Sequence, residues 1–268
     1  MRVALLQYPI AWADKEANLR LAEERIAALA GKADVAVLPE MFATGFCTDH
    51  PELAETMDGD IIRRLQAAAD QSGVAIVSSF ICKPAIGQRL VNRGFMITPH
   101  SVYPNREELE GDPNGGDGGR LFVQDKRHLY AHGGEDLFFQ PAQERHIFEY
   151  KGVKILLLIC YDLRFPVWAR NRSGHDYDII IVVANWPDIR IQYWDALIAA
   201  RATENQCYIA AVNCVGDDGM GLHYNGHSVA YDTRLQPIVS FADNEEGTKI
   251  AEFDIAKLHH FREVLPLW

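Results

Sequence analysis

The sequence predicts an α/β fold in which two β-sheets pack together with helices on the outside. Short apolar runs alternate with amphipathic stretches, beginning with 2–7 (RVALLQ), 15–30, whose apolar residues recur at helical spacing, and 34–38 (DVAVL). Strands that are apolar throughout are typical of parallel sheets buried on both faces. About a dozen strand-like runs follow one another along the chain, which suggests two sheets rather than one.

The same patterns predict the remaining elements in order. We expect a helix over 59–72 and strands over 74–80, 92–98 and 120–125. No helix separates the last two strands, so part of the first sheet is expected to be antiparallel. The second half predicts helices at 165–171 and 191–205 and strands at 154–160, 178–184, 207–213, 228–231, 237–241 and 249–253. The acidic, glycine-rich stretch 104–119 predicts a mobile loop, and with no linker elsewhere residues 1–268 are expected to form one domain.

Composition narrows the class of protein. The formal net charge of −11 argues against a nucleic-acid partner, because phosphate binding relies on a basic face. The most apolar run, 153–160, is too short to cross a membrane, and the first twenty residues lack the apolar core of a signal peptide. Five scattered cysteines in such a chain are best interpreted as reduced thiols. We therefore expect a soluble, cytoplasmic protein.

Three polar residues stand where apolar strands are predicted to end. VAVLPE places Glu40 just past one strand, LFVQDK places Lys126 past another, and KILLLIC places Cys160 at the end of a third. Active sites of α/β proteins gather at the carboxyl ends of strands, so these side chains could meet there.

The trio makes chemical sense together. A thiol nucleophile needs a base or a positive field, a carboxylate can accept its proton, and an ammonium can stabilise an oxyanion. Each residue alone has an ordinary explanation as well: a small buried thiol, a glutamate in the first turn of a helix, and a solvated lysine. The residue types alone therefore do not decide whether these three residues form a catalytic site.

Longer motifs connect this trio to a known family. LPEMF at 38–42, DKRHL at 125–129 and ICYDLRFP at 159–166 resemble the three signature blocks of the nitrilase, or carbon–nitrogen hydrolase, superfamily. The resemblance continues through ANWP (184–187), ARATEN (200–205) and NGHS (225–228). It implies a four-layer α-β-β-α sandwich with mixed sheets, a homodimer or larger homo-oligomer, and a catalytic triad of Glu40, Lys126 and Cys160. It also implies a second glutamate that supports the lysine; Glu135 is expected in this role, with Asp136 as the alternative.

Within the superfamily, MFATGFC, KRHLY, CYDLRFPVWARN and ANWPDIR resemble the omega-amidase branch. That branch hydrolyses the terminal amide of 2-oxo acid monoamides such as 2-oxoglutaramate and 2-oxosuccinamate. An N-carbamoyl amine or amino acid hydrolase, or a general aliphatic amidase, keeps the same fold with another substrate. A non-enzymatic binding protein and a metal-dependent amidohydrolase are more distant alternatives. His223 and His227 lack cysteine or acidic partners in register, so we expect neither a metal nor an organic cofactor.

Four residues are predicted to bind the substrate. The backbone N–H of Tyr161, at a strand-to-helix elbow, is expected to stabilise the oxyanion, and the helix beginning there to favour the Cys160 thiolate. Trp186 and Phe46 could wall the pocket. Arg190 is the candidate for holding a substrate carboxylate, because a guanidinium binds one through two hydrogen bonds. Arg164 is instead expected to pair with a buried carboxylate.

Overall fold

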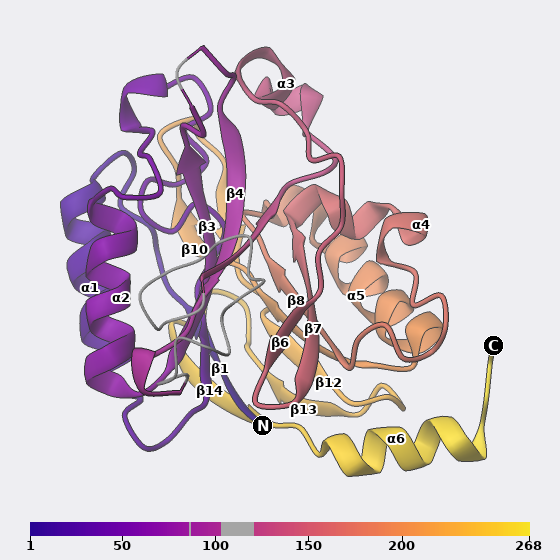
Figure 1. Cartoon of the computed structure of the whole chain (residues 1–268). Helices are drawn as coiled ribbons and strands as arrows, with labels where there is room; N and C mark the ends of the chain where they lie inside the picture. The colour runs from indigo at the N-terminus through magenta and orange to yellow at the C-terminus, as the bar shows by residue number, and fades with distance from the viewer. Residues whose placement is uncertain (86, 103–120) are drawn as a thin grey trace.

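The computed structural model describes residues 1–85, 87–102 and 121–268 of the chain. Within these residues, two six-stranded mixed sheets lie face to face, with helices on both outer sides (Figure 1). The predicted α/β class and the four-layer sandwich are thus confirmed. The predicted loop at 104–119 lies outside the described residues. No helix in the described part of the chain is long and apolar enough to cross a membrane.

The first sheet has the order β14-β1-β2-β3-β4-β5. Its strands are β1 (Arg2–Gln7), β2 (Val35–Val37), β3 (Ala75–Cys82), β4 (Val91–Ile97), β5 (Leu121–Asp125) and β14 (Gly247–Glu252). β1, β2 and β3 are parallel, whereas β4 is antiparallel to both β3 and β5. Because β4 is antiparallel to both of its neighbours, β5 runs in the same direction as β3. The carboxyl ends of β2 and β5 therefore face the same edge of the sheet.

The second sheet has the order β13-β12-β9-β8-β7-β6. Its strands are β6 (Phe148–Tyr150), β7 (Val153–Ile159), β8 (Ile179–Val183), β9 (Tyr208–Val212), β12 (Val229–Tyr231) and β13 (Pro237–Ser240). The three central strands β7, β8 and β9 are parallel. A separate two-stranded ribbon is formed by β10 (Val215–Asp217) and β11 (His223–Asn225).

Helices cover the outer face of each sheet. α1 (Lys15–Ala27) and α2 (Asp60–Ser72) cover the first sheet, while α4 (Pro166–Ala169) and α5 (Ile191–Asn205) lie on the side of the second (Figure 1). The others are α3 (Glu135–Phe138), α6 (Ile255–Val264) and the 3₁₀ turns η1 (Pro51–Leu53), η2 (His100–Val102), η4 (Ala131–Gly133), η5 (Cys160–Arg164) and η6 (Asp188–Arg190). Asp14 caps α1 by accepting a hydrogen bond from the Ala17 N–H at 3.0 Å, which satisfies one of the unpaired donors at the helix start.

β1 shows why the central strands are apolar throughout. Val3 and Leu5 point into the core between the two sheets. Ala4 and Leu6 point to the opposite face, into the core beneath α1 and α2. Because successive side chains of a strand alternate between faces, a strand covered on both sides buries every one of them. All four are fully buried.

The predicted elements differ from the structure in a few places. The helix expected over 165–171 is a single turn, α4, which follows the 3₁₀ turn η5. β6, β10, β11 and α6 were not predicted: the three strands are only three residues long, and α6 buries just Leu258 and Arg262, so its apolar pattern is weak. All five cysteines are free thiols and buried, as expected of reduced residues.

Candidate active site

The three predicted catalytic residues emerge from strands of both sheets. Glu40 follows β2 and Lys126 directly follows β5, so both lie at the same edge of the first sheet. Cys160 directly follows β7 of the second sheet. The Lys126 Nζ lies 2.9 Å from the Glu40 Oε1, and both side chains are fully buried. The packing of the two sheets thus brings together residues that are far apart in the sequence.

Glu135 joins this cluster as the second carboxylate. Its Oε2 lies 2.9 Å from the Lys126 Nζ and accepts a hydrogen bond from the Tyr130 N–H at 2.7 Å. The side chain is fully buried at the first position of α3. Asp136, the alternative from the sequence, is exposed, because the helix turns it away from the lysine. The structure therefore places Glu135, and not Asp136, beside Lys126.

Asn92 connects the two glutamates and was missed in the sequence. Its Nδ2 donates to Glu40 Oε1 at 2.8 Å and to Glu135 Oε1 at 3.1 Å. The residue is buried in β4, and its carbonyl oxygen accepts the Lys126 N–H at 2.9 Å. The only signal in the sequence was a polar residue near the start of a buried strand. One amide group therefore orients both carboxylates toward the same lysine.

Burial and nearby charges have opposite effects on the pKa of Lys126. Burial alone would lower the pKa of the ammonium, but the negative charges of Glu135 and Glu40 outweigh it and raise the pKa above its ordinary value. Lys126 therefore stays charged. Burial, followed by repulsion from Glu40, raises the pKa of Glu135, although Lys126 opposes the shift. The cluster thus contains a permanent cation held between two carboxyl groups.

Cys160 has an unusual backbone conformation. Its φ is 47°, in the left-handed region that residues with a Cβ seldom adopt, and it begins the short turn η5. The thiol is 3.8 Å from the carbonyl oxygen of Asn185. Such a strained elbow at the end of a strand turns the side chain away from the sheet. This position agrees with the elbow predicted from the sequence.

The electrostatics at Cys160 differ from the prediction. Burial, and then the negative charge and hydrogen bond of Glu40, raise the pKa of the Cys160 thiol well above its ordinary value, while Lys126 opposes the shift. The expectation that a helix N-terminus favours the thiolate is wrong, because η5 has only five residues and burial, together with the charge of Glu40, raises the pKa of the thiol. In the free protein Cys160 is therefore a neutral thiol beside a base.

Asn185, which follows β8, was also missed in the sequence. Its N–H donates to Glu40 Oε2 at 2.9 Å, and its Nδ2 donates to the Glu40 carbonyl oxygen at 2.7 Å. Its own Oδ1 accepts a hydrogen bond from the Cys214 thiol at 3.0 Å. Asn185 follows a strand of the second sheet and binds both the side chain and the backbone of Glu40, which follows a strand of the first sheet. These hydrogen bonds therefore connect the two sheets at the site.

Cys160 lies in the wall of a small pocket. Its lining includes the four residues that were predicted to bind the substrate, of which Tyr161 was predicted to do so through its backbone N–H. Its lining residues are Phe46, Tyr130, Cys160, Tyr161, Arg164, Asn185, Trp186, Pro187, Arg190, Leu222 and Tyr224. An apolar pocket with a few polar groups and a reactive residue at its wall is typical of a small-molecule site.

The surroundings of Arg164 differ from the prediction that it pairs with a buried carboxylate. Its Cζ lies 4.9 Å from the ring centroid of Trp186 and 5.1 Å from that of Tyr193. No carboxylate among the described residues pairs with it, so the expected ion pair is wrong. The side chain belongs to the turn η5 and lines the pocket, where the rings of Tyr161, Trp186 and Tyr193 lie near the guanidinium.

Comparisons with known proteins agree with this geometry. The family model described as carbon-nitrogen hydrolase matches residues 2–263. The chain belongs to the carbon–nitrogen hydrolase family. It is 38% identical to the omega-amidase YafV of Escherichia coli K12 over 269 residues, covering 100% of this chain and 95% of the relative. It is 30% identical to a 2-oxoglutaramate amidase of Bacillus subtilis over 268 residues, covering 99% of this chain and 95% of the relative.

A solved structure supports the same assignment. The crystal structure of XC1258 from Xanthomonas campestris, described as a CN-hydrolase superfamily protein, matches with a TM-score of 0.88 at 34% identity. The match covers 99% of this chain and 95% of XC1258. The predicted membership of the nitrilase superfamily is confirmed, and with it the prediction of an amidohydrolase.

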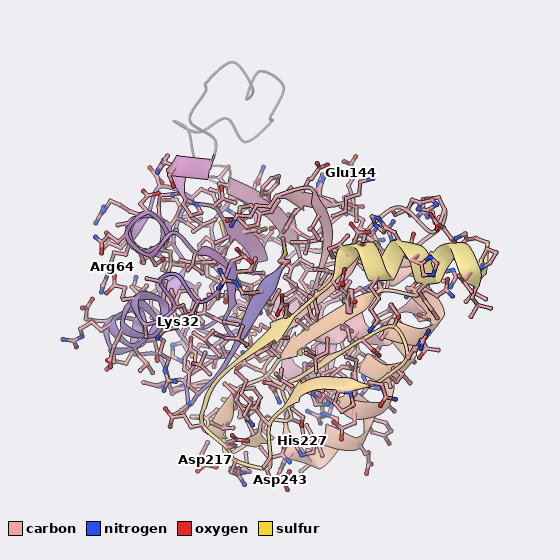
Figure 2. The ribbon with its side chains drawn as sticks, turned by 90° about the horizontal axis from the view of Figure 1, so that it is seen from below. Lys32, Arg64, Glu144, Asp217, His227 and Asp243 are labelled. Atoms are coloured by element: carbon pink, nitrogen blue, oxygen red, sulfur yellow. The ribbon has the colours of Figure 1, made fainter. Side chains whose placement is uncertain are left out.

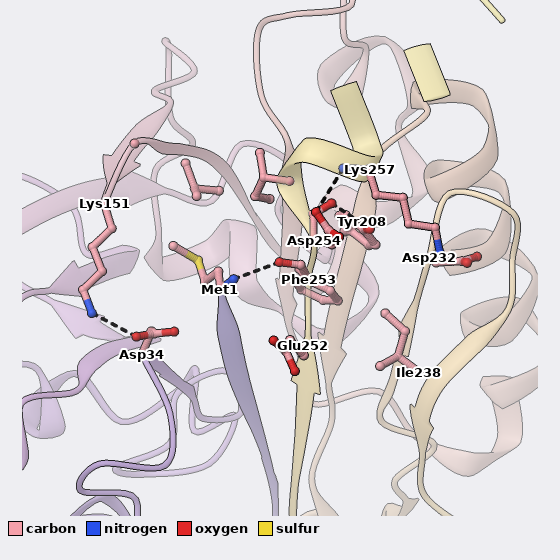
Figure 3. A pocket seen from close by; sticks show the side chains of 13 residues that line it. Met1, Asp34, Lys151, Tyr208, Asp232, Ile238, Glu252, Phe253, Asp254 and Lys257 are labelled. Carbon is pink, nitrogen blue, oxygen red and sulfur yellow. Dashed lines mark hydrogen bonds and ion pairs between the residues drawn. The ribbon is translucent and has the colours of Figure 1, made fainter. Parts of the chain in front are cut away.

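This carbon–nitrogen hydrolase has a second hollow, at the opposite ends of the strands. Met1, Val153 and Tyr208 lie there at the amino ends of the parallel strands β1, β7 and β9 (Figure 3). Its polar groups are largely paired with each other: the Met1 amine donates to the Phe253 carbonyl at 2.8 Å, and the Tyr208 hydroxyl donates to the Asp254 carbonyl at 3.0 Å. We place the candidate site at Cys160 instead, where a nucleophile adjoins a base.

The two histidines with metal-like spacing have other partners. His227 lies between Asp195, at 3.1 Å, and Asp243, and Figure 2 shows His227 beside Asp243 at the surface. Burial opposes the charged ring, but the hydrogen bonds to the two aspartates raise the pKa of His227. His223 contacts Asp217 at 2.7 Å. Both rings take part in ion pairs with aspartates.

Proposed function

We propose that this chain is an omega-amidase, which hydrolyses the terminal amide of 2-oxo acid monoamides through a thioester on Cys160. The observation that carries the proposal is the position of the Lys126 Nζ, 2.9 Å from both Glu40 and Glu135, beside a thiol at the wall of a pocket that also contains Arg190. A nucleophile, a base and a buried cation are the groups that acyl transfer requires.

The first half-reaction forms the thioester. Glu40 takes the proton of the Cys160 thiol as the sulfur attacks the amide carbon, which explains why a neutral resting thiol is no obstacle. The carbonyl oxygen becomes an oxyanion, stabilised by Lys126 and the Tyr161 N–H. The C–N bond then breaks, and the leaving nitrogen takes the proton from Glu40 to depart as ammonia.

The second half-reaction regenerates the thiol. Glu40 takes a proton from water, and the hydroxide attacks the thioester carbon. When the C–S bond breaks, the product leaves as a carboxylic acid and the sulfur recovers its proton through Glu40. Glu40 thus alternates between base and acid in both halves.

Lys126 suits the oxyanion role because of its hydrogen-bond inventory. An ammonium has three N–H donors. Glu40 and Glu135 each take one at 2.9 Å. The third is left for the substrate side, and the two carboxylates fix its direction. Glu135 therefore acts as a positioning residue for the cation, and Asn92 fixes both carboxylates in turn.

The substrate class is supported by charge and by the relatives. The protein has a formal net charge of −11, so an anionic substrate needs a local cation to hold it. Arg190 lines the pocket and supplies one, while Phe46 and Trp186 wall the carbon chain. The relatives named omega-amidase and 2-oxoglutaramate amidase resemble this chain over its whole length. No organic cofactor or metal takes part in the proposed reaction.

We propose that residues 1–268 form one catalytic domain. The family model spans residues 2–263, and both sheets contribute residues to one site. We also propose that two or more copies associate, since the apolar surface of α4 is exposed.

The direct test is ammonia release from a panel of substrates. 2-Oxoglutaramate and 2-oxosuccinamate should be hydrolysed with a kcat/KM at least about ten-fold above that of a neutral amide of equal length, because only they gain the charge-assisted contact. N-carbamoyl amino acids and nitriles belong in the same panel. A preference for either of these classes would contradict the omega-amidase assignment and leave the assignment to the carbon–nitrogen hydrolase family intact.

A further inference from the structure

The pocket contains two arginines where one was expected. Arg164 and Arg190 both line it, and both are partly buried. Among the described residues that line the pocket, none is an aspartate or a glutamate. Two cations next to each other repel unless an anion lies between or beside them. In a protein of net charge −11, this pocket is therefore built to receive negative charge.

The two guanidinium groups flank a shared aromatic pair. The rings of Tyr130 and Tyr161 are 5.2 Å apart, centroid to centroid. The Arg190 Cζ lies 5.4 Å from the Tyr130 ring, and the Arg164 Cζ lies 5.7 Å from the Tyr161 ring. Each guanidinium thus lies within cation–π distance of a ring, and neither forms an ion pair with a carboxylate of the described residues.

Trp186 restrains both arginines from another side. Its ring centroid is 4.9 Å from the Arg164 Cζ, and its Nε1 donates to the Arg190 carbonyl oxygen at 2.8 Å. Arg164 belongs to the turn η5, which begins at Cys160, and Arg190 belongs to the turn η6. The two arginines nevertheless contact the same group of aromatic residues. Their relative position is set by packing and not by a carboxylate.

We infer that Arg164 binds the 2-oxo group of the substrate and thereby selects 2-oxo acid monoamides over simple dicarboxylic acid monoamides. The inference rests on the proposed omega-amidase function. The –CO–COO⁻ end of such a substrate presents three oxygens, whereas one guanidinium fork binds two. Arg190 takes the carboxylate, and Arg164 donates to the oxygen that a plain carboxylate lacks. Arg164 is then a specificity-determining residue.

A purely structural Arg164 would give a different result. The side chain lies near the rings of Trp186, Tyr161 and Tyr193 and also fills space, so its loss would loosen the pocket for every substrate. Arg164→Met keeps most of the aliphatic stem and removes the charge and the donors. Arg164→Lys restores the charge without the planar fork. Arg172→Met, at an exposed arginine, is the control for the loss of one positive charge.

The experiment compares KM and kcat for three substrates of one chain length. 2-Oxoglutaramate has the carboxylate and the oxo group, glutaramate has only the carboxylate, and pentanamide has neither. Arg164→Met should raise KM for 2-oxoglutaramate about ten-fold or more and change KM for the other two less than about three-fold. Arg164→Lys should recover part of the loss, and Arg172→Met should behave as the wild type.

Each other result overturns the assignment. An equal rise for 2-oxoglutaramate and glutaramate would mean that Arg164 binds the carboxylate, and an equal rise for all three would mean that it only packs. No change for any substrate would remove it from recognition. A failure of the proposed function is visible separately, since the wild type would then release no ammonia from 2-oxoglutaramate, and this inference would fall with it.

Discussion

His128 and Asp162 join the loop of the lysine to the turn of the nucleophile. The His128 N–H donates to Asp162 Oδ1 at 2.8 Å, and its Nδ1 lies 2.8 Å from the same oxygen. Asp162 Oδ2 accepts the Ile159 N–H at 3.3 Å, just before Cys160. One buried carboxylate therefore sets the distance between Lys126, two residues before His128, and Cys160, two residues before Asp162. The two sequence motifs are parts of one rigid connection.

Removal of the nucleophile is expected to stop turnover without unfolding the protein. Cys160→Ala should lower kcat about a thousand-fold or more, because no other thiol can form the thioester. Cys82→Ala is a matched control, since Cys82 is buried in the core beneath α1 and α2. Ammonia release and circular dichroism measure the two effects. Near-normal release from Cys160→Ala would show that the reaction has no covalent step on this residue.

Substitution of Glu40 and substitution of Glu135 should lower kcat by different amounts. Glu40→Gln keeps the shape but removes the base, so acylation and deacylation should both slow, with kcat reduced about a hundred-fold or more. Glu135→Gln leaves the base but weakens the hold on Lys126, and we expect a smaller or comparable loss in kcat. Asp136→Asn, at the exposed neighbour, is the control. Wild-type kcat and KM in Glu135→Gln would exclude a role for that residue.

The Arg190 guanidinium is expected to act on the substrate carboxylate. Arg190→Met should raise KM for a 2-oxo acid monoamide about ten- to a hundred-fold, since a charge-assisted bidentate contact contributes roughly 1.5–3 kcal/mol. KM for a neutral amide of equal length should change little. Steady-state kinetics on the two substrates provide the test. Equal effects on both would make Arg190 a structural residue of the pocket wall.

Alkylation should report the protonation state of Cys160. Cys160 is 9% exposed and the other four cysteines are exposed to 3% or less, so iodoacetamide should label Cys160 first. Because burial and Glu40 raise the pKa of its thiol, the thiolate fraction should keep growing with pH. We expect the rate of labelling to rise about ten-fold per unit from pH 7 to 9 without a plateau. A plateau below pH 8, measured by mass spectrometry, would show a stabilised thiolate instead.

Self-association is expected through the surface near α4. Val167, on this helix, is 81% exposed, and Tyr193 at the start of α5 is 49% exposed. Apolar and aromatic side chains of this kind are enriched in the cores of interfaces. Light scattering should give twice the monomer mass of 30.1 kDa or more, and Val167→Asp should shift it toward the monomer.

The control for that shift is Val264→Asp on α6, at a valine that is 69% exposed. It should leave the mass unchanged, because it adds the same charge on another helix. A wild-type mass of 30.1 kDa at micromolar concentration would contradict self-association under those conditions.

Much of the fold could be predicted because its strands are locally distinctive. β1 and α5 have the predicted bounds, since an unbroken apolar run favours a strand and a long stretch rich in alanine, without glycine or proline, favours a helix. β10, β11 and α6 could not be predicted, because short or weakly amphipathic segments are held by contacts made elsewhere in the fold. The pairing of β14 with β1 was equally hidden, since residues 247–252 are distant in sequence from residues 2–7.

The motifs were sufficient to predict the family, the candidate triad and the second glutamate, because short motifs record which chemical groups must be present. How these groups act on each other became visible in the folded structure. The neutral state of the Cys160 thiol depends on its burial and on the charge of Glu40, which comes from the other sheet. The direction of Arg164 depends on the aromatic rings around it. Charge interactions and desolvation depend on distance and surroundings, and these exist only once the two sheets have packed together.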